Sequence, residues 1–251
     1  MLELCGVSGG YGKKMIVRHL SLVVPDGAIT AILGPNGCGK STLLKLLCGQ
    51  LERKQGDVLV GRKSIADYPR AVLAQQIAYL PQSRAVPDIL VETLVLHGRF
   101  PWLGTPRVYL KADRALAREA MAQTGILHKA KMPLPSLSGG ERQKAYLAMA
   151  LAQCTPHILL DEPTAYLDIA CQLDFLALLQ QLKAQGKAVA VVLHDIPMAL
   201  ETADHIAVLQ SGSLVAQGTA TEILHNGALE TAFGVRMVTE PSLRFAPRHM
   251  G

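Results

Sequence analysis

The chain has 251 residues, of which 49% are hydrophobic and 4% aromatic, and its formal net charge is +5. This length suits one α/β domain with an insertion, and the composition predicts an aliphatic core. No apolar run approaches the roughly 20 residues of a spanning helix, which excludes a chain that crosses a membrane by itself. The start lacks a signal-peptide pattern, so we expect a cytoplasmic protein. Basic residues alternate with acidic ones, which argues against a nucleic-acid partner.

The cysteines are scattered and form no CxxC pair. Their number is odd and no export signal precedes them, so we predict reduced thiols rather than disulfides or a metal site. They are Cys5, Cys38, Cys48, Cys154 and Cys171.

The first eighty residues predict strands interrupted by one glycine-rich loop. LVVPDGAITAILG indicates a strand, a turn at Pro25 to Gly27 and a second, buried strand. After a helix, GDVLVGRKSI predicts a small hairpin around Gly61, and IAYLPQ predicts a short strand that ends at Pro81.

The glycine-rich loop GPNGCGKST fits the phosphate-loop pattern G-x-x-x-x-G-K-[ST] between a strand and a helix. Its glycines allow consecutive amides to face phosphates, Lys40 reaches the terminal phosphates, and Ser41 can coordinate Mg²⁺. Cys38 lies near the helix N-terminus and Lys40, which predicts a stabilised thiolate that alkylating reagents reach. The predicted phosphate-binding residues are Gly34, Asn36, Gly37, Cys38, Gly39, Lys40, Ser41 and Thr42.

A helical segment interrupts the alternation of strands and helices. From Ser83 to about Ser136 the pattern is helical and irregular by turns, with an amphipathic helix at ADRALAREAMAQTGI. We interpret it as an inserted helical lobe. The stretch LSGGERQKAYLAMALA follows, with Ser138 and two glycines directly before a helical run. The free amides of a helix N-terminus favour anions, so a second phosphate site is expected there.

Strands and helices alternate again from His157. HILL and AVAVVL are apolar without alternation, which indicates strands covered on both faces of a doubly wound, mostly parallel sheet. A helix separates them, and HIAVLQSGSLVAQG predicts a final hairpin. Asp161 ends the first of these strands, where it would hold Mg²⁺ beside the phosphate loop, and Glu162 would polarise a water aimed at the γ-phosphate.

Six motifs occur in the order of the ATP-binding cassette (ABC) ATPases: GPNGCGKST, LPQ, LSGGERQ, ILLDEP, AYLD and VLHD. The chain resembles this family over nearly its whole length, and LSGGERQ is the most specific motif. The resemblance implies a P-loop NTPase (RecA-like) core with N-terminal antiparallel strands. It also implies that residues 1–251 form a single nucleotide-binding domain, with a helical subdomain inserted at about 83–154. ATP and Mg²⁺ are the implied cofactors.

The same resemblance assigns roles to individual residues. Two subunits would pack head to tail, so that the signature of one chain faces the ATP of the other. Tyr11 would stack on adenine, and Gln82 would sense Mg²⁺ and the attacking water. His194 would contact the γ-phosphate and order Glu162, while Asp168 would communicate between the two sites. The signature residues expected to act in trans are Ser138, Gly139, Gly140 and Gln143.

Two further stretches, HGRFPWLG and PTAYLDIACQLDFLALLQQL, resemble ATPases of iron-siderophore, haem and cobalamin importers. Ala165 and Cys171 stand where that group more often has Thr and His, and DIPMALETADHI replaces an Asn-containing run. The resemblance implies two transmembrane permease subunits, a periplasmic or surface substrate-binding protein, and a place on the cytoplasmic face of the membrane. Trp102 lies in the lobe expected to touch the permease. A soluble ABC-type ATPase, such as an iron-sulfur assembly factor, and an exporter ATPase remain as alternatives.

Overall fold

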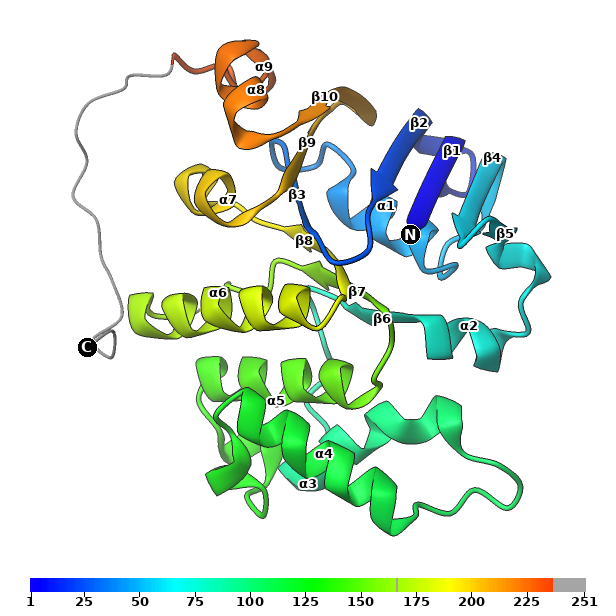
Figure 1. Ribbon diagram of the computed structural model, residues 1–251, viewed down its shortest axis with the longest axis vertical. Coiled ribbons are helices and arrows are strands. Elements are labelled where there is room, and N and C mark those ends of the chain that lie inside the picture. The colour runs from blue at the N-terminus through cyan, green and yellow to red at the C-terminus, as the bar shows by residue number, and fades with distance from the viewer. Residues whose placement is uncertain (166, 237–251) are drawn as a thin grey trace.

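The computed structural model describes residues 1–165 and 167–236, so Tyr166 of the AYLD motif and residues 237–251 lie outside the described part. Within it, two sheets occupy one end of the molecule and a group of helices the other, as Figure 1 shows. None of the described helices has the length and hydropathy needed to cross a membrane.

The larger sheet has six strands in the order β10-β9-β3-β8-β7-β6. Neighbouring strands are parallel except for the β9–β10 hairpin, which is antiparallel. Every residue of β3, β7 and β8 is buried. The doubly wound, mostly parallel sheet is therefore confirmed. Its strands are β3 (Ile29–Leu33), β6 (Ile77–Leu80), β7 (His157–Asp161), β8 (Ala188–Val192), β9 (His205–Gln210) and β10 (Ser213–Gly218).

The smaller sheet is antiparallel, with the order β2-β1-β4-β5. It packs over α1 (Lys40–Leu47), whose leucines share one hydrophobic core with Leu2, Val58 and Ile32 of the two sheets. This core covers one face of the larger sheet and confirms the predicted N-terminal antiparallel strands. They are β1 (Leu2–Tyr11), β2 (Lys14–Val24), β4 (Arg53–Val60) and β5 (Lys63–Ser64).

The other face of the larger sheet packs against helices. Alternate residues of a strand point to opposite faces, so Ala31 and Leu33 join a second core, separate from the one that holds Ile32. The helices that contribute buried side chains to this second core include α6 (Ile169–Ala184), α7 (Ile196–Thr202), α8 (Ala220–His225) and α9 (Ala228–Phe233).

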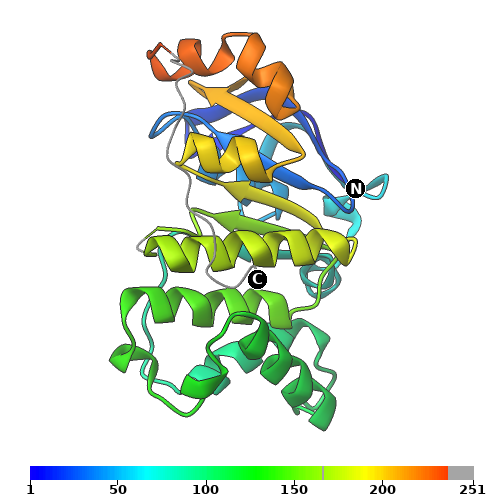
Figure 2. The same ribbon diagram turned by 60° about the vertical axis from the view of Figure 1, so that its left-hand side comes forward.

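The regular elements between residues 83 and 154 are all helical in the described chain. α5 runs alongside α6 in both Figure 1 and Figure 2 and connects this group to the core of the larger sheet. The boundaries of an inserted subdomain stay a prediction. The elements are η1 (Ile65–Asp67) and α2 (Arg70–Gln76) before the group, then α3 (Val91–Leu96), η2 (His97–Trp102), α4 (Lys111–Gln123), η3 (Leu127–Lys129), η4 (Leu134–Ser136) and α5 (Gly139–Ala152).

Candidate functional site

The glycine-rich loop connects the end of β3 to the start of α1. Gly39 precedes α1 with φ 112°, a left-handed conformation that favours glycine. A side chain on Gly34 has no room, because its Cβ would lie 2.3 Å from the carbonyl oxygen of Leu209. The Lys40 Nζ donates to the carbonyls of Gly34, at 2.7 Å, and of Pro35, at 3.1 Å. The loop therefore curls around the lysine, as a phosphate cradle requires.

The structure contradicts the prediction that Cys38 is a stabilised, accessible thiolate. Its side chain is buried, with 5% exposed. Burial raises the pKa of the Cys38 thiol, and the nearby Lys40 only partly opposes this. The charge of Lys40 and the helix terminus favour the thiolate, but desolvation penalises it more strongly here. All five cysteines are free thiols in the structure.

Asp161 ends β7 beside the phosphate loop. Its carboxylate accepts hydrogen bonds from the Ser41 hydroxyl, at 3.1 Å, and from the Tyr79 hydroxyl, at 3.2 Å. Burial raises the pKa of Asp161, while these two hydrogen bonds oppose the rise. The carboxylate and hydroxyl oxygens form a hard donor set of the kind that Mg²⁺ prefers.

Glu162 follows directly and has a left-handed backbone, with φ 50°, which is rare for residues other than glycine. One carboxylate oxygen lies 2.6 Å from the His194 Nε2, and the other accepts a hydrogen bond from the Gln82 side-chain amide. The strained backbone and the two contacts together fix the direction of a carboxylate whose side chain is 12% exposed.

Glu162, His194 and Gln82 line one open cavity of about 420 Å³ together with residues of the phosphate loop. Tyr11, 49% exposed, lies at this cavity, and its hydroxyl accepts a hydrogen bond from Lys45 at 3.2 Å. Besides Tyr11 and two glycines of the loop, seven predicted site residues line the cavity. They are Asn36, Lys40, Ser41, Thr42, Gln82, Glu162 and His194. The cavity combines a phosphate loop, an aromatic ring and a positioned carboxylate.

The signature residues form no part of this cavity's lining. Ser138 instead caps α5: its Oγ accepts from the Glu141 amide at 3.3 Å, and Glu141 accepts from the Ser138 amide at 2.9 Å. Asp168 caps α6 by accepting from the Cys171 amide at 2.7 Å. The Gln143 side chain bonds to Arg84 and Pro163 of its own chain.

Sequence reasoning missed Tyr79 and Arg84. Tyr79 reaches Asp161 because β6 lies next to β7, a neighbour relation that no motif in the sequence encodes. Arg84 follows the LPQ motif by two residues, and nothing in its spacing indicates that it reaches α5.

Comparisons with known proteins agree with this geometry. The family model for the ABC transporter matches residues 17–165. The ferric enterobactin transport ATP-binding protein FepC of Escherichia coli (strain K12) is 42% identical over 229 residues, which cover 90% of this chain and 84% of that protein. A metal-chelate type ABC transporter in an inward-facing conformation has 32% identity and a TM-score of 0.80, covering 93% of this chain and 88% of that chain.

A dimeric bacterial ABC transporter cassette is also similar, with 27% identity and a TM-score of 0.77, covering 88% of this chain and 99% of that chain. The matched residues include the phosphate loop, the signature, Asp161 and Glu162. With its two-sheet core and its helical group, the chain belongs to the ABC transporter family.

Proposed function

We propose that this protein is the ATP-hydrolysing subunit of a bacterial ABC importer for an iron-siderophore or a related metal chelate, such as haem or cobalamin. The observation that carries the hydrolytic part is Glu162, held by His194 and Gln82 at the edge of the cavity that contains the phosphate loop. The similarity to the ferric enterobactin transport protein and to the metal-chelate type transporter supports the importer class.

ATP would bind with its adenine on the exposed ring of Tyr11 and its phosphates on the amides of the loop. Lys40 would exchange its carbonyl partners for phosphate oxygens. Ser41 and Asp161 would hold Mg²⁺, with the side-chain oxygen of Gln82 nearby. Bound Mg²⁺ supplies the positive charge that neutralises the developing negative charge on the phosphates.

Glu162 would act as the general base, because a carboxylate in this position can orient and polarise water in line with the γ-phosphate. His194, whose side chain is 49% exposed, would contact the γ-phosphate while it keeps Glu162 in place. Asp168, at the start of α6, would respond to the partner's site.

A second copy of the chain would complete each site. Ser138, Gly139 and Gly140 lie at the N-terminus of the 14-residue helix α5, outside the lining of their own cavity. The Ser138 hydroxyl and the amides of Gly139 and Gly140 suit a phosphate of another chain's nucleotide. The similar cassette is dimeric, which supports pairing of two chains in this protein.

The η2 segment is the proposed contact with the permease. Phe100 and Trp102 are 46% and 42% exposed there, and neighbouring exposed aromatic side chains suit a contact with another protein. Two transmembrane subunits would dock on this side, and a periplasmic or surface binding protein would deliver the chelate. The chain would then lie peripherally on the cytoplasmic face of the membrane.

Glu162→Gln tests the proposed function. The substitution keeps the side-chain shape and the ATP cavity but removes the basic carboxylate, so we expect turnover to fall about 100-fold or more while ATP still binds. Steady-state phosphate release and equilibrium ATP binding are the measurements. Turnover close to that of the wild type would contradict the role of Glu162. Co-purification with a polytopic membrane subunit separates the importer from a soluble ATPase.

A further inference from the structure

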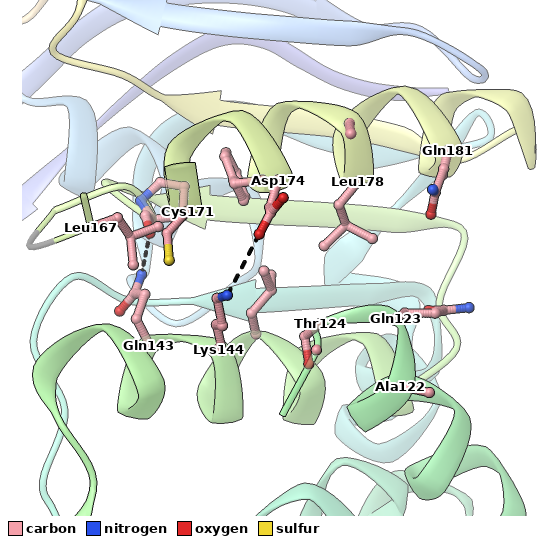
Figure 3. A pocket seen from close by; sticks show the side chains of 15 residues that line it. Ala122, Gln123, Thr124, Gln143, Lys144, Leu167, Cys171, Asp174, Leu178 and Gln181 are labelled. Atoms are coloured by element: carbon pink, nitrogen blue, oxygen red, sulfur yellow. Dashed lines mark hydrogen bonds and ion pairs between the residues drawn. The ribbon is translucent and has the colours of Figure 1, made fainter. Parts of the chain in front are cut away.

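A cleft of about 270 Å³ separates α5 from α6, and Figure 3 shows its lining. Two polar contacts between described residues span it, drawn as dashed lines in Figure 3. The Lys144 Nζ lies 3.7 Å from an oxygen of Asp174, and the Gln143 side-chain amide donates to the Pro163 carbonyl at 2.6 Å. Among the described residues, the polar contacts that join the signature helix to the segment after Glu162 are therefore few.

The other end of the Gln143 amide binds a third segment. The Arg84 Nη1 donates to the Gln143 Oε1 at 2.8 Å, and the Arg84 Nε donates to the Pro81 carbonyl at 2.6 Å. Pro81 precedes Gln82, and Pro163 follows Glu162. A continuous chain of hydrogen bonds thus runs from Pro81, beside Gln82, through Arg84 and Gln143 of α5 to Pro163, beside Glu162.

Arg84 is not arranged for stability alone. Its guanidinium lies 4.9 Å from the centre of the Tyr146 ring, and its Nη2 is buried with no hydrogen-bond partner among the described residues. Burial lowers the pKa of Arg84 to about 10. A buried donor without a partner costs about 1–3 kcal/mol, so the two hydrogen bonds that Arg84 makes come with a cost in stability.

We propose that Arg84 and Gln143 are positioning residues for hydrolysis, which connect the signature helix of a chain to Gln82 and Glu162 of that same chain. The inference rests on the proposed function. It reassigns Gln143, which the family resemblance places among the residues that act on the partner's nucleotide. Both ends of its amide bind its own chain, so a shift of α5 caused by the partner's phosphate would move Glu162 and Gln82.

The first test separates binding from turnover. Gln143→Leu removes both hydrogen bonds at similar volume, and we expect kcat to fall about 10-fold or more while the KM for ATP changes less than about 2-fold. Gln143→Glu keeps an acceptor for Arg84 but loses the donor to Pro163, and should show the same kcat loss. Arg84→Lys keeps the charge without the forked geometry and should lose less.

Lys144→Met is the matched control. It removes the other contact across the same cleft without touching Pro163 or Arg84, so its kcat should stay within about 2-fold of the wild type. Thermal unfolding of each variant identifies destabilised chains. A Gln143→Glu protein that is folded and turns over like the wild type would overturn the proposal, as would equal losses in Lys144→Met.

The second test asks whose nucleotide Gln143 serves. In a Glu162→Gln background, which stops hydrolysis, we measure the ATP concentration that half-saturates dimer formation with and without Gln143→Leu. If Gln143 positions residues of its own chain, the half-saturating ATP concentration should be the same with and without Gln143→Leu, within about 2-fold. A direct contact with the partner's phosphate predicts an increase of about 10-fold, which would contradict the inference.

The two proposals fail separately. If the wild type and the Glu162→Gln variant hydrolyse ATP equally, the proposed function is wrong. If those two differ as expected but Gln143→Leu and Arg84→Lys match the wild type in kcat, only the positioning role is wrong.

Discussion

Single side chains of the site differ in how far solvent reaches them, as the buried Cys38 and the half-exposed Tyr11 illustrate. Tyr11 is half exposed and open to a base, whereas the side chain of Cys38, within the phosphate loop, is buried. A thiol that is both buried and raised in pKa reacts slowly, because only its thiolate is nucleophilic. We therefore expect Lys40 and Ser41, rather than Cys38, to be the loop side chains that contact the phosphates and Mg²⁺.

N-ethylmaleimide labelling followed by peptide mass spectrometry checks this assignment. At neutral pH we expect Cys38 to react at least about 10-fold more slowly than the exposed Cys5 and Cys154, which serve as internal controls. Unfolding in urea should equalise the rates. Labelling of Cys38 at the rate of Cys5 in the native protein would mean that the loop exposes the thiol.

At the scale of the elements, η2 joins the C-terminus of α5 to α4. The Arg99 Nε donates to Asp113 at 3.0 Å, its Nη1 donates to the Ala152 carbonyl at 2.9 Å, and the Trp102 Nε1 donates to the Gln153 carbonyl at 2.8 Å. These bonds satisfy carbonyls that a helix end leaves free. The segment proposed to face the permease is thus bonded to the helix whose other end carries the signature.

Removing one partner of the buried Arg99–Asp113 ion pair should destabilise the fold. The Arg99 and Asp113 side chains are 8% and 11% exposed, and Arg99→Met would leave the carboxylate of Asp113 without its cation. We expect the free energy of unfolding to fall by about 3 kcal/mol, measured by urea denaturation at pH 7. Lys129→Met, at a half-exposed pair with Glu141, is the control and should change it by less than about 1 kcal/mol.

The same pair predicts a dependence on pH. Burial by itself would raise the pKa of Asp113, but the Leu110 amide and Arg99 outweigh it and hold the pKa below 3.8. Its charged form is therefore favoured in the folded state, so the stabilisation is present above about pH 4 and is lost as the pH falls through the folded pKa. The difference in stability between the wild type and Asp113→Asn should shrink between pH 5 and pH 3. A stability difference that grows as the pH falls through this range would contradict a lowered pKa of Asp113 in the folded state.

At the scale of the whole molecule, the sequence predicts the parallel sheet, the phosphate loop and the helical segment, because each rests on local patterns. Strand order is not local: the Tyr79 hydroxyl meets Asp161 only because β6 lies beside β7. Desolvation of Cys38 and the inward direction of Gln143 also depend on packing. The motifs therefore indicate which residues matter, while the fold determines what each side chain contacts.

The proposed dimer requires that Ser138 to Gly140 bind the nucleotide of a second chain. A mixed dimer tests it, in which one chain carries Lys40→Ala and its partner carries Gly139→Asp, which sets a carboxylate against the γ-phosphate. Head-to-tail packing places both lesions in one composite site and leaves the other site intact. Either mutant homodimer has no intact site.

Mixed dimers purified through two different tags should therefore close on ATP through the intact site, as measured by crosslinking across the interface. Closure is a better measure than turnover, because hydrolysis could require both sites. With a composite site, we expect clear ATP-dependent crosslinking in the mixed dimer and little in either mutant homodimer. If the mixed dimer closes no better than the mutant homodimers, each signature serves its own chain's ATP and the composite site is wrong.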